Sequence, residues 1–154
     1  MDNLIEVSDL HKSFGPLVAV DGVSLQIKRG EVLGFLGPNG AGKSTTMKMI
    51  TGFIAPTSGS VRICGHDVAA DPLAAKTRIG YLPEGAPAYG EMTVGGFLDF
   101  IADIRALRGS TKQERIREVV AKIHLEHVLG QTIETLSKGF KRRVGLAQAI
   151  LHDP

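Results

Sequence analysis

The feature that most constrains this chain is a glycine-rich loop that begins at Gly37 and ends at Ser44. Its residues match the pattern G-x-x-x-x-G-K-[ST] in full: Gly37, Pro38, Asn39, Gly40, Ala41, Gly42, Lys43 and Ser44. The apolar run 32–36 before the loop is typical of a strand buried on both faces, and the residues from Lys43 onward favour a helix. In this setting the glycines let backbone N–H groups turn toward phosphate oxygens, and the helix dipole adds positive potential. The pattern therefore predicts a phosphate-binding loop.

The polar residues at the end of the loop have roles that this chemistry predicts. Lys43 would reach the β- and γ-phosphates of a nucleotide, the Ser44 hydroxyl would ligate Mg²⁺, and Thr45 would add a hydrogen bond to a phosphate. The glycine spacing does not fit the G-x-G-x-x-G pattern of a dinucleotide-binding fold. No D-x-x-G or [NT]-K-x-D motif of a GTPase follows the loop. We therefore expect ATP and Mg²⁺ as ligands.

The chain divides into a strand-rich first half and a helical second half. Short strands are expected at residues 4–7, 23–27, 32–36, 61–63 and 79–82. Helical spacing predicts helices from 43, with Met47, Ile50 and Phe53 facing inward, from 93 to 107 with Thr93 as N-cap, from 111 to 123, and from about 137. We expect an α/β fold with a nucleotide-binding core at 1–84, an inserted helical subdomain at 85–140, and a helix returning to the core at 141–154.

Composition excludes several classes of protein. Hydrophobic residues make up 43% of the chain and charged residues 22%, which favours a packed core over disorder. The 18 basic and 16 acidic residues nearly balance, and the basic cluster at 138–143 has no larger basic face around it, so no nucleic-acid partner is expected. The one cysteine, Cys64, fits a reducing compartment and is expected to be buried. No long apolar run or signal-peptide pattern occurs, so we expect a cytoplasmic chain.

Three further motifs accompany the phosphate loop. They are Lys12-Ser13-Phe14-Gly15, Gly80-Tyr81-Leu82-Pro83-Glu84 and Leu136-Ser137-Lys138-Gly139-Phe140. Together with the loop they make residues 4–154 resemble the ATP-binding subunit of an ABC (ATP-binding cassette) transporter. Within that family the chain is most similar to the subfamily paired with ABC-2-type permeases, which includes gliding-motility exporters. The resemblance implies a P-loop NTPase fold of the ABC ATPase type.

The resemblance also implies roles for four residues outside the loop. Phe14 lies where the family has an aromatic ring that stacks on adenine. Glu84 replaces the family's loop glutamine, and its carboxylate is still able to ligate Mg²⁺. Ser137 and Gly139 would form a second anion site that binds the γ-phosphate held by a second ATP-binding subunit in a head-to-tail dimer. Lys138 and Phe140 depart from the family's commonest form.

Several parts of the family's machinery follow a segment like Leu151–Pro154 and are not found in these residues. They are the Mg²⁺-coordinating Asp, the general-base Glu and the switch His. We expect a domain that is incomplete at its C-terminus, hydrolysis-deficient by itself, and prone to associate through an open strand edge at 32–36. The resemblance implies a membrane permease partner that holds the subunit peripherally at the inner membrane. The alternatives are a non-transport module that uses ATP as a structural or regulatory ligand, or a non-transport ABC ATPase acting on DNA or ribosomes.

Overall fold

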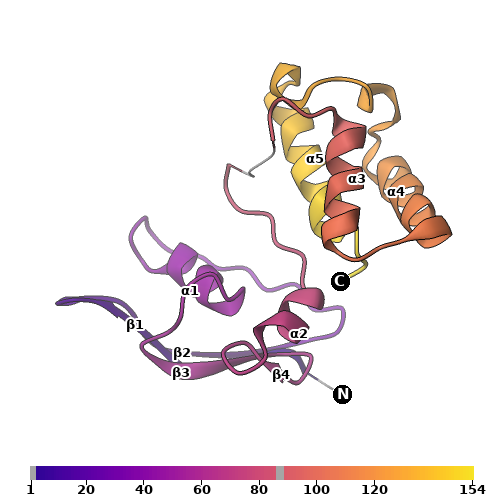
Figure 1. The fold of residues 1–154 in the computed structure, drawn as a ribbon. Coiled ribbons are helices and arrows are strands. Elements are labelled where there is room, and N and C mark those ends of the chain that lie inside the picture. Colours follow the sequence, from indigo (N-terminus) through magenta and orange to yellow (C-terminus); the bar gives the residue numbers. More distant parts are fainter. Residues whose placement is uncertain (1–2, 86–88) are drawn as a thin grey trace. The chain divides into compact units, whose positions relative to one another are not determined.

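The computed structural model describes residues 3–85 and 89–154, which form two compact units, Met1–Ile79 and Gly80–Pro154 (Figure 1). The first unit contains β1 (Asn3–Phe14), β2 (Leu17–Lys28), α1 (Lys43–Ile50), β3 (Ser58–Ile63), β4 (His66–Asp67) and α2 (Pro72–Thr77). The second contains α3 (Val94–Ile104), α4 (Gly109–Ile123), the 3₁₀ turns η1 (Glu126–Val128) and η2 (Ile133–Thr135), and α5 (Lys138–Ile150). The strand-rich first half and helical second half are confirmed. The division at residues 84 and 140 stays a prediction.

The sheet of the first unit is antiparallel, with the strand order β2-β1-β3-β4. Strand β1 changes its alternation at a bulge between Val7 and Leu10, where Asp9 has a φ of 46°. The extra residue lets both Val7 and Leu10 face the core. Helices α1 and α2 lie on the same side of the sheet (Figure 1). Between helices and sheet lies a core formed by Val7, Leu10, Val20, Met49, Ile50, Val61, Ile63 and Ala75.

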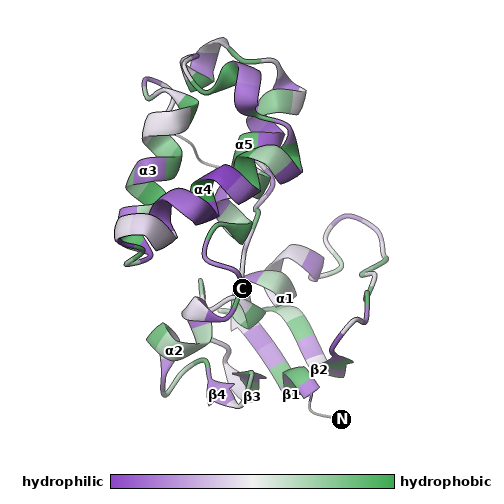
Figure 2. Ribbon diagram, turned by 90° about the vertical axis from the view of Figure 1, so that its right-hand side faces the viewer, coloured by the Kyte–Doolittle hydropathy of each residue, from purple (hydrophilic) through white to green (hydrophobic). Residues whose placement is uncertain are grey.

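Two of the expected strands do not form. The segment 32–36 runs as a loop between β2 and α1 (Figure 2), and the side chains of Val32 and Leu36 are each 96% exposed. A strand needs a hydrogen-bonding neighbour, and no described strand pairs with this segment. The segment 79–82 is also without strand structure. Its backbone contacts α5 instead, because the Gln148 amide donates to the Tyr81 carbonyl oxygen over 3.3 Å.

Three side-chain expectations were wrong for local reasons. Helix α1 ends at Ile50, so Phe53 lies beyond it and is 65% exposed. Met47 is also exposed, whereas Met49 faces the core beside Ile50. Cys64 is exposed rather than buried, because it occupies the two-residue turn between β3 and β4 with a φ of 49°. A turn residue at a sheet end has little neighbouring structure to cover it.

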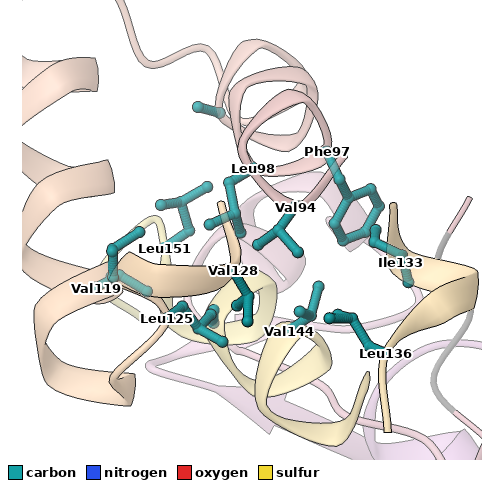
Figure 3. Close-up of a cluster of buried hydrophobic side chains, with 13 residues drawn as sticks. Val94, Phe97, Leu98, Val119, Leu125, Val128, Ile133, Leu136, Val144 and Leu151 are labelled. Carbon is teal, nitrogen blue, oxygen red and sulfur yellow. The ribbon is translucent and has the colours of Figure 1, made fainter. Parts of the chain in front are cut away.

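The helical unit has its own core, drawn in Figure 3. Helices α3 and α4 each contribute buried apolar residues to it, as do α5 and the connections between the helices. The labelled members are Val94, Phe97, Leu98, Val119, Leu125, Val128, Ile133, Leu136, Val144 and Leu151. Thr93 caps α3 by accepting from the Gly96 N–H over 3.1 Å, as the sequence predicts. No helix among residues 3–85 and 89–154 combines the length and the apolar character that crossing a membrane requires.

Candidate nucleotide-binding site

The conformation of the loop at 37–44 favours glycine at three positions, because Gly37, Gly40 and Gly42 all have positive φ angles. Gly40 has a φ of 85° and Gly42 a φ of 83°, both in the left-handed region that side chains disfavour. At Gly42 space is also limiting, since a Cβ atom there would overlap the carbonyl oxygen of Ala19 and lie 3.2 Å from Cγ2 of Val20. The loop backbone therefore packs directly against β2, and no residue with a side chain fits at Gly42.

Lys43 closes the loop on itself. Its ammonium group donates to the carbonyl oxygens of Gly37 and Pro38, each over 2.6 Å, and the Ala41 N–H donates to the Pro38 carbonyl over 3.2 Å. These bonds hold the positive charge inside the curve of the loop. A phosphate group seated on the loop would meet this charge directly.

The N-terminus of α1 is the second part of the candidate phosphate site, after the loop. Gly42 is its N-cap, and no side chain among the described residues caps the helix there. Both hydrogen-bond donors of Thr46 have a partner in the same turn, because its N–H and its hydroxyl donate to the Gly42 carbonyl oxygen over 2.8 and 2.9 Å. The first-turn N–H groups of Lys43, Ser44 and Thr45 have no intrahelical acceptor. These donors and the helix dipole fit a phosphate anion, and the adjacent Ser44 hydroxyl fits a phosphate-bound Mg²⁺.

Phe14 belongs to the hairpin against which the loop packs. It is the last residue of β1, is paired with Leu17 across the β1–β2 turn, and is 50% exposed. Ala19, which Gly42 contacts, lies two residues along β2 from that pair. The structure thus brings the predicted base-stacking ring and the phosphate loop to one end of one hairpin. Lys12, which sequence reasoning missed, places its ammonium 5.0 Å from the centre of the Phe14 ring.

The second anion site predicted from sequence begins at Ser137. Its hydroxyl accepts from the Phe140 N–H over 3.3 Å and caps α5. Gly139 lies in the first turn, where a Cβ atom would meet only the Ser137 hydroxyl, at 4.0 Å. The Phe140 ring makes a T-shaped contact with the His127 ring, with 5.3 Å between the ring centres, and the Arg143 guanidinium lies 5.0 Å from the centre of the Phe140 ring.

Glu84 is exposed in the turn at 84–85 of the second unit, whereas Ser44 belongs to the first. A Mg²⁺ site shared by these two residues stays a prediction. Among residues 3–85 and 89–154, no three His, Cys, Asp or Glu side chains gather as a metal site.

Sequence reasoning also missed the close approach of Gly80 to α5, where a Cβ atom would overlap the Ala149 carbonyl oxygen. In the sequence, this close approach is indicated only by the glycine that begins the motif at 80–84.

Comparisons with known proteins agree with this geometry. A family model described as "ABC transporter" matches residues 20–154. The chain is 38% identical over 153 residues to the probable multidrug ABC transporter ATP-binding protein YbhF of Escherichia coli K12, covering 99% of this chain and 26% of that protein. It is 36% identical over 154 residues to the bacitracin transport ATP-binding protein BcrA of Bacillus licheniformis, covering 100% and 49%.

Solved structures show the same fold. An ATP-binding subunit of an ABC transporter superposes with a TM-score of 0.88 at 32% identity, covering 98% of this chain and 63% of that chain. CbiO1 of Clostridium perfringens, part of the complex cbiONQ, superposes with a TM-score of 0.85 at 25% identity, covering 100% and 63%. The chain spans about a quarter to a half of the curated relatives it matches. The expected α/β fold is confirmed, and the chain belongs to the ABC transporter family.

Proposed function

We propose that this chain forms the nucleotide-binding part of an ABC transporter subunit that couples ATP binding and hydrolysis to transport through a separate membrane permease. The observation that carries the proposal is the phosphate loop, in which left-handed glycines curve the backbone around Lys43 before α1. The printed names of the relatives support it, because they are ATP-binding proteins of transporters.

In this proposal the chain's own residues hold the nucleotide at both ends. The amides of the loop and of the first turn of α1 donate to phosphate oxygens, and Lys43 moves from the loop carbonyls to the phosphates. Phe14 offers its ring to the adenine base. Ser44 and Glu84 would hold Mg²⁺, which when bound neutralises phosphate charge. The loop thereby orients the phosphate chain in one direction.

The partners of this chain are proposed from the second anion site and from the family resemblance. Ser137 and Gly139 at the start of α5 would close on the nucleotide of a second ATP-binding subunit, which gives a head-to-tail dimer. A permease would hold the subunit peripherally at the inner membrane, on the cytoplasmic side, through the surface beside Glu84 and α3. For residues 1–154 by themselves we expect weak ATP binding and little turnover. A non-transport module is not supported by the relatives, which are named for transport.

The test is calorimetric titration of the chain with MgATP. Lys43→Ala should weaken binding by at least about tenfold, because it removes a charge-assisted contact to phosphate. Lys48→Ala is the matched control, since it removes the same charge from an exposed position on the same helix. The control should bind like the parent. If Lys43→Ala binds MgATP as tightly as the parent, the site assignment is wrong.

A further inference from the structure

Lys12 contacts both the Phe14 ring, which is the candidate stacking surface for the base, and the backbone at Ala55. The Lys12 ammonium lies 5.0 Å from the centre of the Phe14 ring and donates to the carbonyl oxygen of Ala55 over 2.7 Å. Both residues belong to the turn-proximal end of β1, and the contact between the ammonium and the ring places their side chains together. The lysine therefore has two simultaneous partners, an aromatic face and a backbone carbonyl.

Two more hydrogen bonds join the same stretch of β1 to the same loop. The Thr57 N–H donates to the His11 carbonyl over 2.8 Å, and the Ser13 N–H donates to the Thr57 hydroxyl over 3.0 Å. With the bond from Lys12 to Ala55, three bonds tie residues 11–13 to residues 55–57. We call these three bonds the strap.

The strap reaches the phosphate loop through α1. Residues 55–57 follow that helix, and the N–H groups of Phe53 and Ile54 both donate to the carbonyl oxygen of Lys48 in its last turn. Helix α1 begins at the phosphate loop. One continuous set of bonds therefore runs from the Phe14 ring to the helix that carries the loop. A ligand that contacts both ends would find their separation already set.

We propose that Lys12 is a positioning residue that holds the Phe14 ring as a stacking platform for the base of the bound nucleotide. The inference rests on the proposed function. The ammonium attracts one face of the ring, and its bond to Ala55 keeps the ammonium from leaving. The ring is 50% exposed, so it has surface to offer a base. A ring already held in place loses less freedom when the base binds.

The test separates the base from the phosphates. The parent chain and Lys12→Ala are titrated calorimetrically with MgATP and with magnesium tripolyphosphate, which has the phosphate chain but no base. Lys12→Ala should bind MgATP about two- to fivefold more weakly, as expected for losing an exposed cation–π contact. Its affinity for tripolyphosphate should stay within the error of the parent. Lys12→Arg keeps a cation and a donor and should restore MgATP binding.

Two controls distinguish positioning from general effects. Lys28→Ala removes a lysine from the far end of the same hairpin, where it pairs with Asn3, and should leave both affinities unchanged. In a Phe14→Ala background, Lys12→Ala should have no further effect on MgATP, because Lys12 acts through the ring. A structural role alone would weaken tripolyphosphate binding as much as MgATP binding.

Each other result overturns the inference. If Lys12→Ala binds MgATP as well as or better than the parent, the lysine does not support the base, and the proposed function survives. If Lys12→Ala loses affinity for both ligands equally, the residue serves the fold. If the parent binds neither ligand, both the inference and the proposed function fail.

Discussion

The N-termini of α1 and α5 are both predicted to face phosphate, but they are built differently. Helix α1 begins at Gly42, whose left-handed backbone carries no side chain and packs against Ala19. Helix α5 begins at Ser137, whose backbone is extended and whose hydroxyl already caps the helix. No side chain among the described residues therefore caps the first turn of α1, whereas the Ser137 hydroxyl accepts from the Phe140 N–H in the first turn of α5. This difference supports the proposal that the primary phosphate site lies at α1.

The largest effect is expected at Gly42, the N-cap of α1 at the end of the phosphate loop. Gly42→Ala should lower the free energy of unfolding by about 3 kcal/mol, because a left-handed residue gains a side chain that overlaps the Ala19 carbonyl. Gly40→Ala is the matched control. It has a φ of 85° but nothing within 4 Å of its Cβ position, so it should cost only about 1–2 kcal/mol.

Urea denaturation followed by circular dichroism measures both variants. At α5 the corresponding change, Gly139→Ala, should be close to neutral, because the position has open space and ordinary helical backbone. A Gly139→Ala chain that is destabilised as much as Gly42→Ala would break the comparison between the two helices.

A smaller effect is expected from the serines of the two helices. Ser137→Ala should cost about 1 kcal/mol of stability, because it removes the N-cap of α5. Ser44→Ala should leave the ligand-free stability within about 0.5 kcal/mol but weaken Mg²⁺-dependent ATP binding. Thermal unfolding with and without MgATP measures both. Equal loss of ligand-free stability in the two variants would show that α1 also relies on a serine cap.

The smallest effect concerns the charges that join α3 to α4. The Lys112 ammonium lies 2.7 Å from Asp99 and 2.9 Å from Asp103. Its hydrogen bond to Asp103 holds the pKa of that carboxyl below its ordinary value. A carboxyl with a lowered pKa stabilises the folded state above its unfolded pKa and loses that contribution as pH falls below about 4.

Asp103→Asn should therefore lower the melting temperature slightly at neutral pH and flatten its decline below about pH 4. Scanning calorimetry across pH measures this, with Glu114→Gln as the control for an exposed carboxyl on α4. If the decline in Asp103→Asn is as steep as in the parent, the ion pairs do not contribute to the acid sensitivity of the helical unit.

Features that depend on neighbouring residues in the chain were predictable from the sequence, and features that depend on distant partners were not. The loop at 37–44, the caps Thr93 and Ser137 and the three long helices depend on local residue patterns, and the structure has them where expected. The strand at 32–36 was predicted from its apolar residues, but a strand exists only with a neighbour, and the described residues provide none. Burial of an apolar run is a property of its partners as much as of its own sequence.

The incorrect and absent predictions near the site have the same cause, namely structure that depends on more than the local sequence. Phe53 follows the apolar spacing of α1, yet the helix ends before it, so spacing alone placed it in the core. The sequence places Lys12 in a motif but does not predict its contacts with Phe14 and Ala55. Ala55 lies 43 residues further along the chain than Lys12. Long-range hydrogen bonds of this kind leave no local pattern.

The most direct test of the central claim is a ¹H–¹⁵N spectrum of the labelled chain during titration with MgATP. We expect shifts in the amides of residues 37–45 and of Phe14, while the amides of residues 138–140 stay unchanged in the same monomeric molecule. Shifts at the start of α5 without shifts in the loop before α1 would contradict this claim.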